Sequence, residues 1–192
     1  MDHGSDRMTL FTAQSDAVLS VLKREGICYS KREYVEKKYG AVSPVFLTAY
    51  GWFVSRAASY VPLPDGAEYP YWLFRDPFNV PAEAGRLLRL SVPIGECIFF
   101  DMQDWNRILQ LRLIGASLQE ERNYADELKA RGLNYNKVML SSFYPEDQQK
   151  ILQSWDRLFR HHEKVRAGDL SCAENLQAAV FRLKREWFED EL

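Results

Sequence analysis

The sequence has few of the features that mark disulfide-rich, membrane-spanning or strongly basic proteins. It contains only three cysteines in 192 residues, Cys28, Cys97 and Cys172, and no C-x-x-C pair. An odd number of widely spaced cysteines indicates reduced thiols, which favours a cytoplasmic protein. No apolar run reaches the length of a membrane span, so we expect no membrane contact. The net charge of -2 gives no basic excess for bulk nucleic-acid binding, although a local basic patch is compatible with it.

Short catalytic and metal-binding motifs are also missing. The chain has no glycine-rich phosphate loop, no G-x-S-x-G elbow and no paired Cys/His metal spacing. The only histidine cluster is His161-His162-Glu163, and adjacent helical side chains point about 100° apart, which suits a shared metal poorly. We therefore expect no metal. This cluster is predicted to be a solvated helix end, where the C-terminal dipole favours cationic histidine.

Aromatic and other hydrophobic residues are plentiful, at 14% and 46% of the chain. This composition is enough for one core, and the length predicts one domain. We place the domain at residues 9–192. Residues 1–8 are polar and acidic, and we expect them to form a loose or disordered tail.

Hydrophobic periodicity predicts alternating groups of strands and helices. Apolar or alternating runs predict strands at 9–14, 69–76, 86–93, 95–101 and 176–181. Helical spacing, Ser15 and Asp101 as caps and Gly26 as a stop predict helices within 15–26, 44–61, 102–115, 117–136 and 144–165. The helix within 117–136 is expected to carry a charged, solvated face that includes Glu121. The order of these elements predicts an α+β domain with a helical insertion at 117–165 before the last strand.

Four segments carry a resemblance to a known family: "LFTAQSDAVLSVLKREGI", "EYPYWLFRDP", "RLSVPIGECIFFDMQDWNRIL" and "LQAAVFRL". Together they resemble the bacterial family called domain of unknown function 3841. The resemblance covers most of Leu10 to Phe188. It departs at Phe11, where the family usually has tryptophan, and it implies no established activity.

The same order of segments resembles, more distantly, the DarT-type ADP-ribosyltransferases. That resemblance implies a split, mostly antiparallel sheet that holds NAD in a cleft. It places Thr12, Ala13 and Gln14 where the first strand meets nicotinamide, although the usual His or Arg is missing there. The pocket segment of that fold corresponds to a run of aromatic residues and an arginine, at Tyr71, Trp72, Phe74 and Arg75.

The last two strands complete the implied site. "IFFD" resembles a strand that ends in Phe-x-Asp, which makes Asp101 a candidate binding residue. The catalytic Glu of the last strand, whose charge would stabilise an oxocarbenium-like transition state, corresponds to Ala179. Glu174 lies five positions earlier, and Gln177 is polar but neutral, so both are weak catalytic candidates.

The aromatic run at 71–74 has two interpretations that the sequence leaves open. On a strand, Tyr71 and Leu73 face one way while Trp72 and Phe74 face the other. A central strand buried on both faces has this pattern, and so does the wall of a ligand pocket.

The polar candidates have two interpretations as well. Arg75 follows four hydrophobic residues and requires an acidic partner, which Asp76, Asp101 or a ligand phosphate would provide. Thr12 and Gln14 suit either strand-end hydrogen bonds or recognition of a carboxamide or base edge. A buried glutamine on the last strand would need a partner too, either the glutamine of the first strand or a ligand.

Two functions fit these residues. One is an ADP-ribosyltransferase-like domain, a toxin or defence factor, that binds NAD or another nucleotide in an aromatic-lined cleft and whose activity is divergent or lost. The other is a non-catalytic module on the same fold that binds a protein partner. The missing Glu and His/Arg favour the second function, and the arginine and paired glutamines favour the first.

Overall fold

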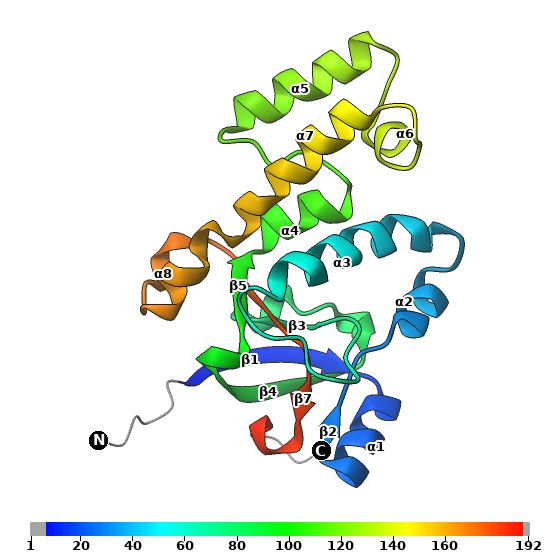
Figure 1. Cartoon of the computed structure of the whole chain (residues 1–192). Helices are drawn as coiled ribbons and strands as arrows, with labels where there is room; N and C mark the ends of the chain where they lie inside the picture. The colour runs from blue at the N-terminus through cyan, green and yellow to red at the C-terminus, as the bar shows by residue number, and fades with distance from the viewer. Residues whose placement is uncertain (1–6, 190–192) are drawn as a thin grey trace.

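The chain folds around a five-stranded antiparallel sheet (Figure 1). The computed structural model describes residues 7–189, apart from the side chain of Ala82. The strand order is β4-β1-β3-β6-β5, and each neighbouring pair is antiparallel. The strands of this sheet are β1 (Arg7–Gln14), β3 (Tyr71–Phe74), β4 (Arg86–Pro93), β5 (Ile98–Asp101) and β6 (Leu176–Val180), and a two-stranded sheet pairs β2 (Ile27–Cys28) with β7 (Leu183–Lys184).

The predicted N-terminal tail is too long. Arg7 and Met8 belong to β1, where they pair with Pro93 and Val92 of β4. Met8 is buried in the core beneath the sheet, which explains why the strand begins before the first residue of the predicted domain. Residues 1–6, the rest of the predicted tail, lie outside the described part of the chain.

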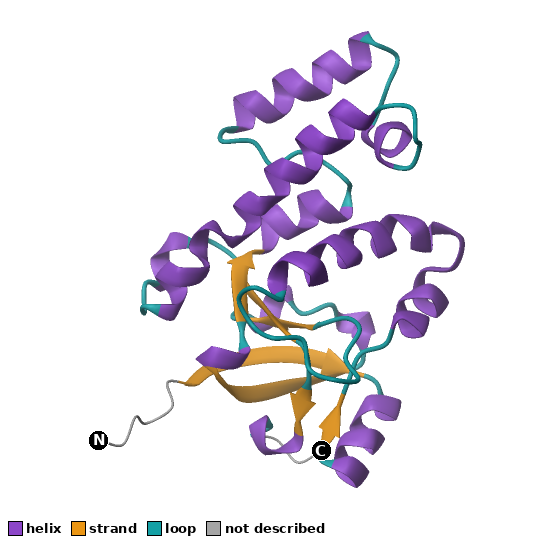
Figure 2. Ribbon diagram, viewed as in Figure 1, coloured by secondary structure: helices purple, strands orange, loops and turns teal. Residues whose placement is uncertain are grey.

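Helices flank the sheet, as the sequence predicts for an α+β domain (Figure 2). Gly26, at φ 76°, ends the first helix, and its N–H donates to the carbonyl of Leu22. Asp101 caps α4 by accepting from the backbone N–H of Gln103 at 2.8 Å. The helices are α1 (Asp16–Glu25), α2 (Arg32–Tyr39), α3 (Ser43–Ala57), α4 (Met102–Leu109), α5 (Leu118–Ala130), α6 (Tyr135–Met139), α7 (Pro145–Trp155) and α8 (His162–Arg166).

Of the neighbouring strands in the sheet, β1 and β3 share the fewest paired residues. All eight residues of β1 pair with β4, but Phe11 and Phe74 form the single register pair that joins β1 to β3. Next to that pair, the Thr12 hydroxyl donates to the carbonyl of Trp72 at 3.1 Å. The β4-β1 and β3-β6-β5 parts of the sheet therefore meet over a short distance.

Both faces of β3 are covered. Tyr71 and Leu73 belong to the cluster that β1, β4 and α1 share, whereas Trp72 packs against the cluster that α3, α4 and α7 form. The interpretation of this run as a doubly covered central strand is therefore confirmed. The same strand also lines a cavity.

The helical insertion, α5 to α8, lies between β5 and β6 and is joined to the rest by buried charge. Glu121 accepts from Arg107 Nε at 2.9 Å and from the backbone N–H of Gly115 at 3.1 Å. Arg160 Nη2 lies 2.7 Å from Asp104 Oδ2. Glu121 is 8% exposed, so its placement on a solvated face was wrong. Its partners come from other segments of the chain, and they compensate for its desolvation.

The histidine cluster also differs from its prediction. His162 has no exposed surface, and its Nδ1 accepts the backbone N–H of Phe99 at 3.1 Å. Burial lowers the pKa of His162, against a smaller opposing effect of the carboxylate of Glu163. The predicted solvated, cationic helix end is therefore wrong at this residue, because the insertion folds His162 onto β5.

This burial makes the fold sensitive to mild acid. The unfolded chain, with an ordinary histidine pKa of about 6.5, binds the proton more readily than the folded chain does. The free energy of unfolding should therefore decrease as the pH falls from about 6.5 toward the lower folded pKa. Urea unfolding between pH 7 and 5.5 measures this slope. His162→Gln should reduce it. Burial and the neighbouring Arg160 lower the pKa of His161 too, so His161→Gln measures the separate contribution of that residue. An unchanged slope in His162→Gln would contradict the assignment.

Candidate functional site

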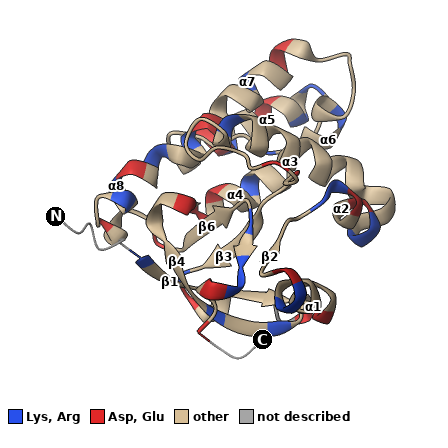
Figure 3. Cartoon of the chain, turned by 60° about the horizontal axis from the view of Figure 1, so that its bottom comes forward, with Lys and Arg blue, Asp and Glu red and all other residues tan. Residues whose placement is uncertain are grey.

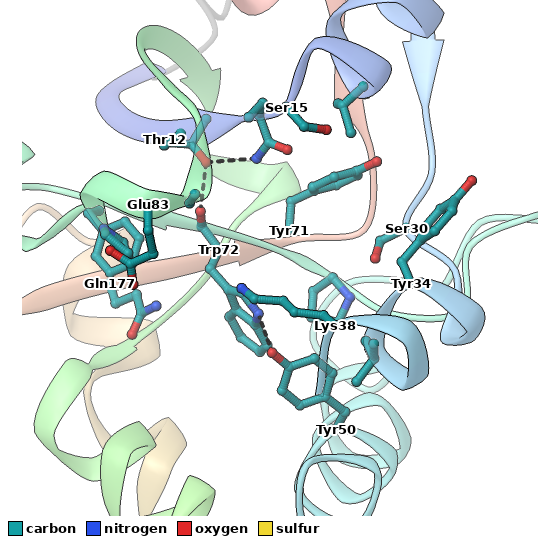
Figure 4. A pocket seen from close by; sticks show the side chains of 18 of the residues that line it. Thr12, Ser15, Ser30, Tyr34, Lys38, Tyr50, Tyr71, Trp72, Glu83 and Gln177 are labelled. Carbon is teal, nitrogen blue, oxygen red and sulfur yellow. Dashed lines mark hydrogen bonds between the residues drawn. The ribbon is translucent and has the colours of Figure 1, made fainter. Parts of the chain in front are cut away.

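A cavity of about 740 Å³ opens between the first strand-helix unit, β3 and the helices α2 to α4. This volume lies within the range of small-molecule pockets, roughly 300 to 1,000 Å³. Its lining combines apolar and aromatic side chains with several polar groups (Figure 4). The residues come from β1, α1, β2, α2, α3, β3, α4 and β6, and from the segments before α2 and on either side of β3.

An aromatic cluster forms one wall of this cavity. The indole N–H of Trp72 donates to the Tyr50 hydroxyl at 3.1 Å, and the Trp72 and Trp105 rings lie 4.5 Å apart. Burial raises the pKa of Tyr50, so its phenol stays protonated and neutral. Two further rings, Phe53 and Phe100, pack against Trp72 with ring centres 5.3 and 6.1 Å away. The wall is therefore rigid and presents aromatic surface suited to a flat ligand.

The end of β1 forms the polar rim. Thr12 is 2% exposed, and its hydroxyl both donates to Trp72 and accepts from Gln14 Nε2 at 2.9 Å. Ser15, the residue before α1, has extended backbone but makes no side-chain cap. The first turn of α1 thus faces the cavity through Ser15, Ala17 and Val18.

Gln177 reaches the cavity from the middle of the sheet. It stands in register between Phe74 and Phe100, on the β6 face that also carries Ala179. The side chain is 3% exposed, and no described group donates to its Oε1. A buried carbonyl without a hydrogen-bond donor destabilises the folded protein by roughly 1 to 3 kcal/mol. A ligand that donates a hydrogen bond to this oxygen would remove that penalty.

Lys38 and Glu83 are the charged side chains among the described residues of the lining. Lys38 extends from α2 into the cavity (Figure 4), and its Nζ lies 5.3 Å from the centre of the Tyr39 ring. Glu83 lies on the short turn Ala82–Ala84 that precedes β4. The lining therefore offers one cation and one carboxylate.

Tyr71 closes the cavity floor beside Cys28. Its hydroxyl donates to Cys28 Sγ at 3.1 Å, and burial raises the pKa of Tyr71. Both residues line the cavity. The three cysteines are free thiols, and Cys28 and Cys97 are buried.

Seven of the residues that the resemblance singles out converge on this cavity. They are Thr12, Ala13, Gln14, Tyr71, Trp72, Phe74 and Gln177. The convergence is a matter of position, and the binding role of each residue remains a prediction. Of the two partners that the sequence leaves open for Gln177, Gln14 does not donate to its Oε1: the Gln14 amide donates to Thr12.

Three candidates do not line the cavity. Arg75 is exposed and donates to the carbonyl of Thr9 at 3.2 Å, so the predicted ion pair with Asp76 or Asp101 was wrong. Asp101 caps α4 and accepts the N–H of Asn175 at 3.2 Å, which makes it structural. Glu174 is exposed on the turn before β6.

Ala179 lies in the core rather than in the cavity. It has no exposed surface and pairs with Trp72 on one side and Ile98 on the other. A carboxylate at this position would be buried against the aromatic cluster. Lys38, Tyr50 and Glu83 are lining residues that the sequence did not reveal, and the spacing of Tyr34 and Lys38 on one face of α2 was the available signal.

A comparison with protein families identifies the domain. The family model described as "Domain of unknown function (DUF3841)" matches residues 9–189. The chain belongs to this family. The matched span includes every residue that lines the cavity, so the cavity is part of the DUF3841 domain. Neither the curated proteins nor the solved structures contain a match.

Across residues 7–189, no group of three His, Cys, Asp or Glu side chains is placed to hold a metal ion. In the same range, no helix is both long and apolar enough to cross a membrane. Acidic and basic residues are interspersed along the ribbon rather than separated onto two sides (Figure 3).

Proposed function

We propose that the cavity binds NAD or another nucleotide, with the flat part of the ligand against the Trp72 wall. The observation that supports this proposal is the convergence of the β1 end, the aromatic segment and Gln177 on one cavity. Nucleotides need an aromatic or apolar surface for the base and a few fixed polar groups for its edge. Thr12 and Gln14 provide fixed polar groups beside the aromatic wall.

The lining supports nucleotide binding better than it supports cleavage of the nucleotide. Cleavage of NAD requires negative charge near the developing oxocarbenium ion. The position that corresponds to the catalytic Glu is Ala179, and it is buried in the core. Glu83 is the carboxylate of the described lining, so any such reaction in this pocket would depend on it.

Thermal unfolding with and without ligand tests the proposal. NAD, AMP, nicotinamide and ADP-ribose should be tested separately at millimolar concentration. A ligand at about 100 times its dissociation constant adds roughly 2.7 kcal/mol, which raises Tm by a few degrees in a domain of this size.

Two variants make this measurement specific. Gln14→Ala removes a side chain of the cavity rim and should reduce the shift. Arg75→Ala removes an exposed cation outside the cavity and should leave the shift unchanged. A shift that Arg75→Ala abolishes and Gln14→Ala preserves would place the ligand elsewhere, and no shift with any of the four compounds would refute nucleotide binding.

A protein-interaction module is the second candidate, and exposed apolar side chains of the insertion favour it. Leu140 and Phe143, between α6 and α7, are 48% and 82% exposed. Exposed apolar side chains that lie close together are a common mark of protein contacts. The double variant Leu140→Ser/Phe143→Ser should then abolish partner capture while leaving the ligand-induced Tm shift intact.

A further inference from the structure

The cavity has a hydrogen-bond acceptor end. Gln177 Oε1 is buried there without a donor, and the Glu83 carboxylate can only accept unless it is protonated. Figure 4 shows Glu83 and Gln177 on the same side of Trp72, away from Ser30 and Tyr34. A ligand group that satisfies the Gln177 oxygen must therefore bring an N–H or O–H. A ring edge with an amino or carboxamide group has such a donor, whereas a carboxylate or a carbonyl edge does not.

A different part of the cavity favours negative charge. Lys38 carries the one cation of the described lining, and Figure 4 shows its side chain reaching toward Trp72 from the side of the cavity that Ser30 and Tyr34 also line. The first turn of α1, a helix of ten residues, also faces the cavity, and helix N-termini favour anions. Asp16 in that turn opposes this effect, but it does not line the cavity.

The number of cations limits the charge of the ligand. The described lining contains one lysine and no arginine, and its one carboxylate lies at the acceptor end. One cation matches one phosphate better than it matches a diphosphate, because the described lining offers the second phosphate no second cation. The two ends together describe a molecule with a donor on a flat ring and a single anionic group.

We propose that the ligand of this cavity is a mononucleotide whose base carries an amino or carboxamide N–H, bound with that N–H on Gln177 Oε1 and its phosphate on Lys38. This inference rests on the proposed nucleotide-binding function and narrows it. Gln177 acts as the residue that selects the base edge. Lys38 acts as the residue that selects the phosphate.

Calorimetric titration of three related compounds tests both contacts. AMP has the 6-amino group and the phosphate, purine riboside 5′-phosphate lacks only the amino group, and adenosine lacks only the phosphate. AMP should bind about tenfold more tightly than either of the others, because each loses one hydrogen-bonded or charged contact.

Variants assign each preference to its residue. Gln177→Leu should bring the affinities for AMP and purine riboside 5′-phosphate within about threefold of each other. Gln177→Glu keeps an acceptor and should keep the preference for AMP, which covers the case in which the leucine variant fails to fold. Lys38→Gln should weaken AMP but not adenosine, whereas Lys37→Gln, the exposed neighbour outside the cavity, should weaken neither.

The outcomes separate the inference from the function on which it rests. If AMP and purine riboside 5′-phosphate bind equally well to the unchanged protein, the role of Gln177 is refuted while nucleotide binding stands. If Lys38→Gln weakens adenosine and AMP by the same factor, the phosphate contact is refuted. If none of the three compounds binds, and NAD does not bind either, both the inference and the proposed function are refuted.

Discussion

Replacement of Gly85 by alanine should lower the free energy of unfolding by roughly 3 kcal/mol. Gly85 has a φ of +126°, a backbone conformation that residues with a side chain rarely adopt. An added Cβ would lie 2.6 Å from the carbonyl carbon of Gln14, closer still to its oxygen, and 3.0 Å from the nitrogen of Ser15. These are backbone atoms, which β1 holds in place by its pairing with β4, so they cannot move aside cheaply.

Gly51→Ala is the matched control for this prediction. Gly51 lies within α3, is exposed and would place its new Cβ in open space. Alanine there should stabilise the helix by about 0.5 to 1 kcal/mol. Denaturant unfolding of both variants measures the difference. Equal stability of the two variants would show that the approach of Gly85 to Gln14 does not constrain the fold.

The Gly85 variant should also weaken ligand binding. Gln14 and Ser15, the residues that the new methyl group would displace, line the cavity. A titration with AMP on the folded fraction of Gly85→Ala therefore tests whether the position of the β1 end matters for the site. Unchanged affinity would mean that the ligand does not contact this rim.

The second large effect is expected at Trp155, whose replacement by alanine should cost about 3 to 5 kcal/mol. Trp155 is fully buried at the end of α7. Its ring lies 5.3 Å from that of Trp52 in α3, and its Nε1 donates to the carbonyl of Arg112 at 2.7 Å. The substitution removes packing between the insertion and α3 and leaves a buried carbonyl without a donor.

Trp155→Phe separates the two contributions. Phenylalanine keeps most of the ring volume but cannot donate to Arg112, so it should cost about 1 to 3 kcal/mol. Hydrogen exchange locates the loss, which should be largest in α4, α5 and α7. If Trp155→Ala unfolds the insertion while the sheet keeps its protection, the two parts are separate cooperative units.

Local signals in the sequence predicted most of the elements. Gly26 ends α1 and Asp101 caps α4, and both act through hydrogen bonds with residues close in the sequence. The period of the apolar residues separated strands from helices for the same reason. The end of α3 was placed four residues too late, because the apolar spacing continues to Val61 although the helix stops at Ala57.

Contacts between distant segments could not be predicted in this way. Glu121 and His162 are polar residues in charged surroundings along the chain, but Arg107 and Phe99 give them buried partners. The lining of the cavity has the same origin. Lys38 and Glu83 line the same cavity as the residues predicted from the sequence because of where α2 and the turn before β4 lie in the fold. No local sequence pattern encodes that placement.

The position of β6 has a consequence for the order of assembly. β6 lies between β3 and β5, yet it follows both in the chain and comes after the whole helical insertion. A nascent chain that has not reached Leu176 therefore contains two apolar strands with unpaired edges. Such non-local pairing slows folding, and chains truncated before β6 are expected to aggregate rather than to form a smaller domain. The last strand of the five-stranded sheet to be synthesised thus fills the gap between β3 and β5 and brings Gln177 to the cavity.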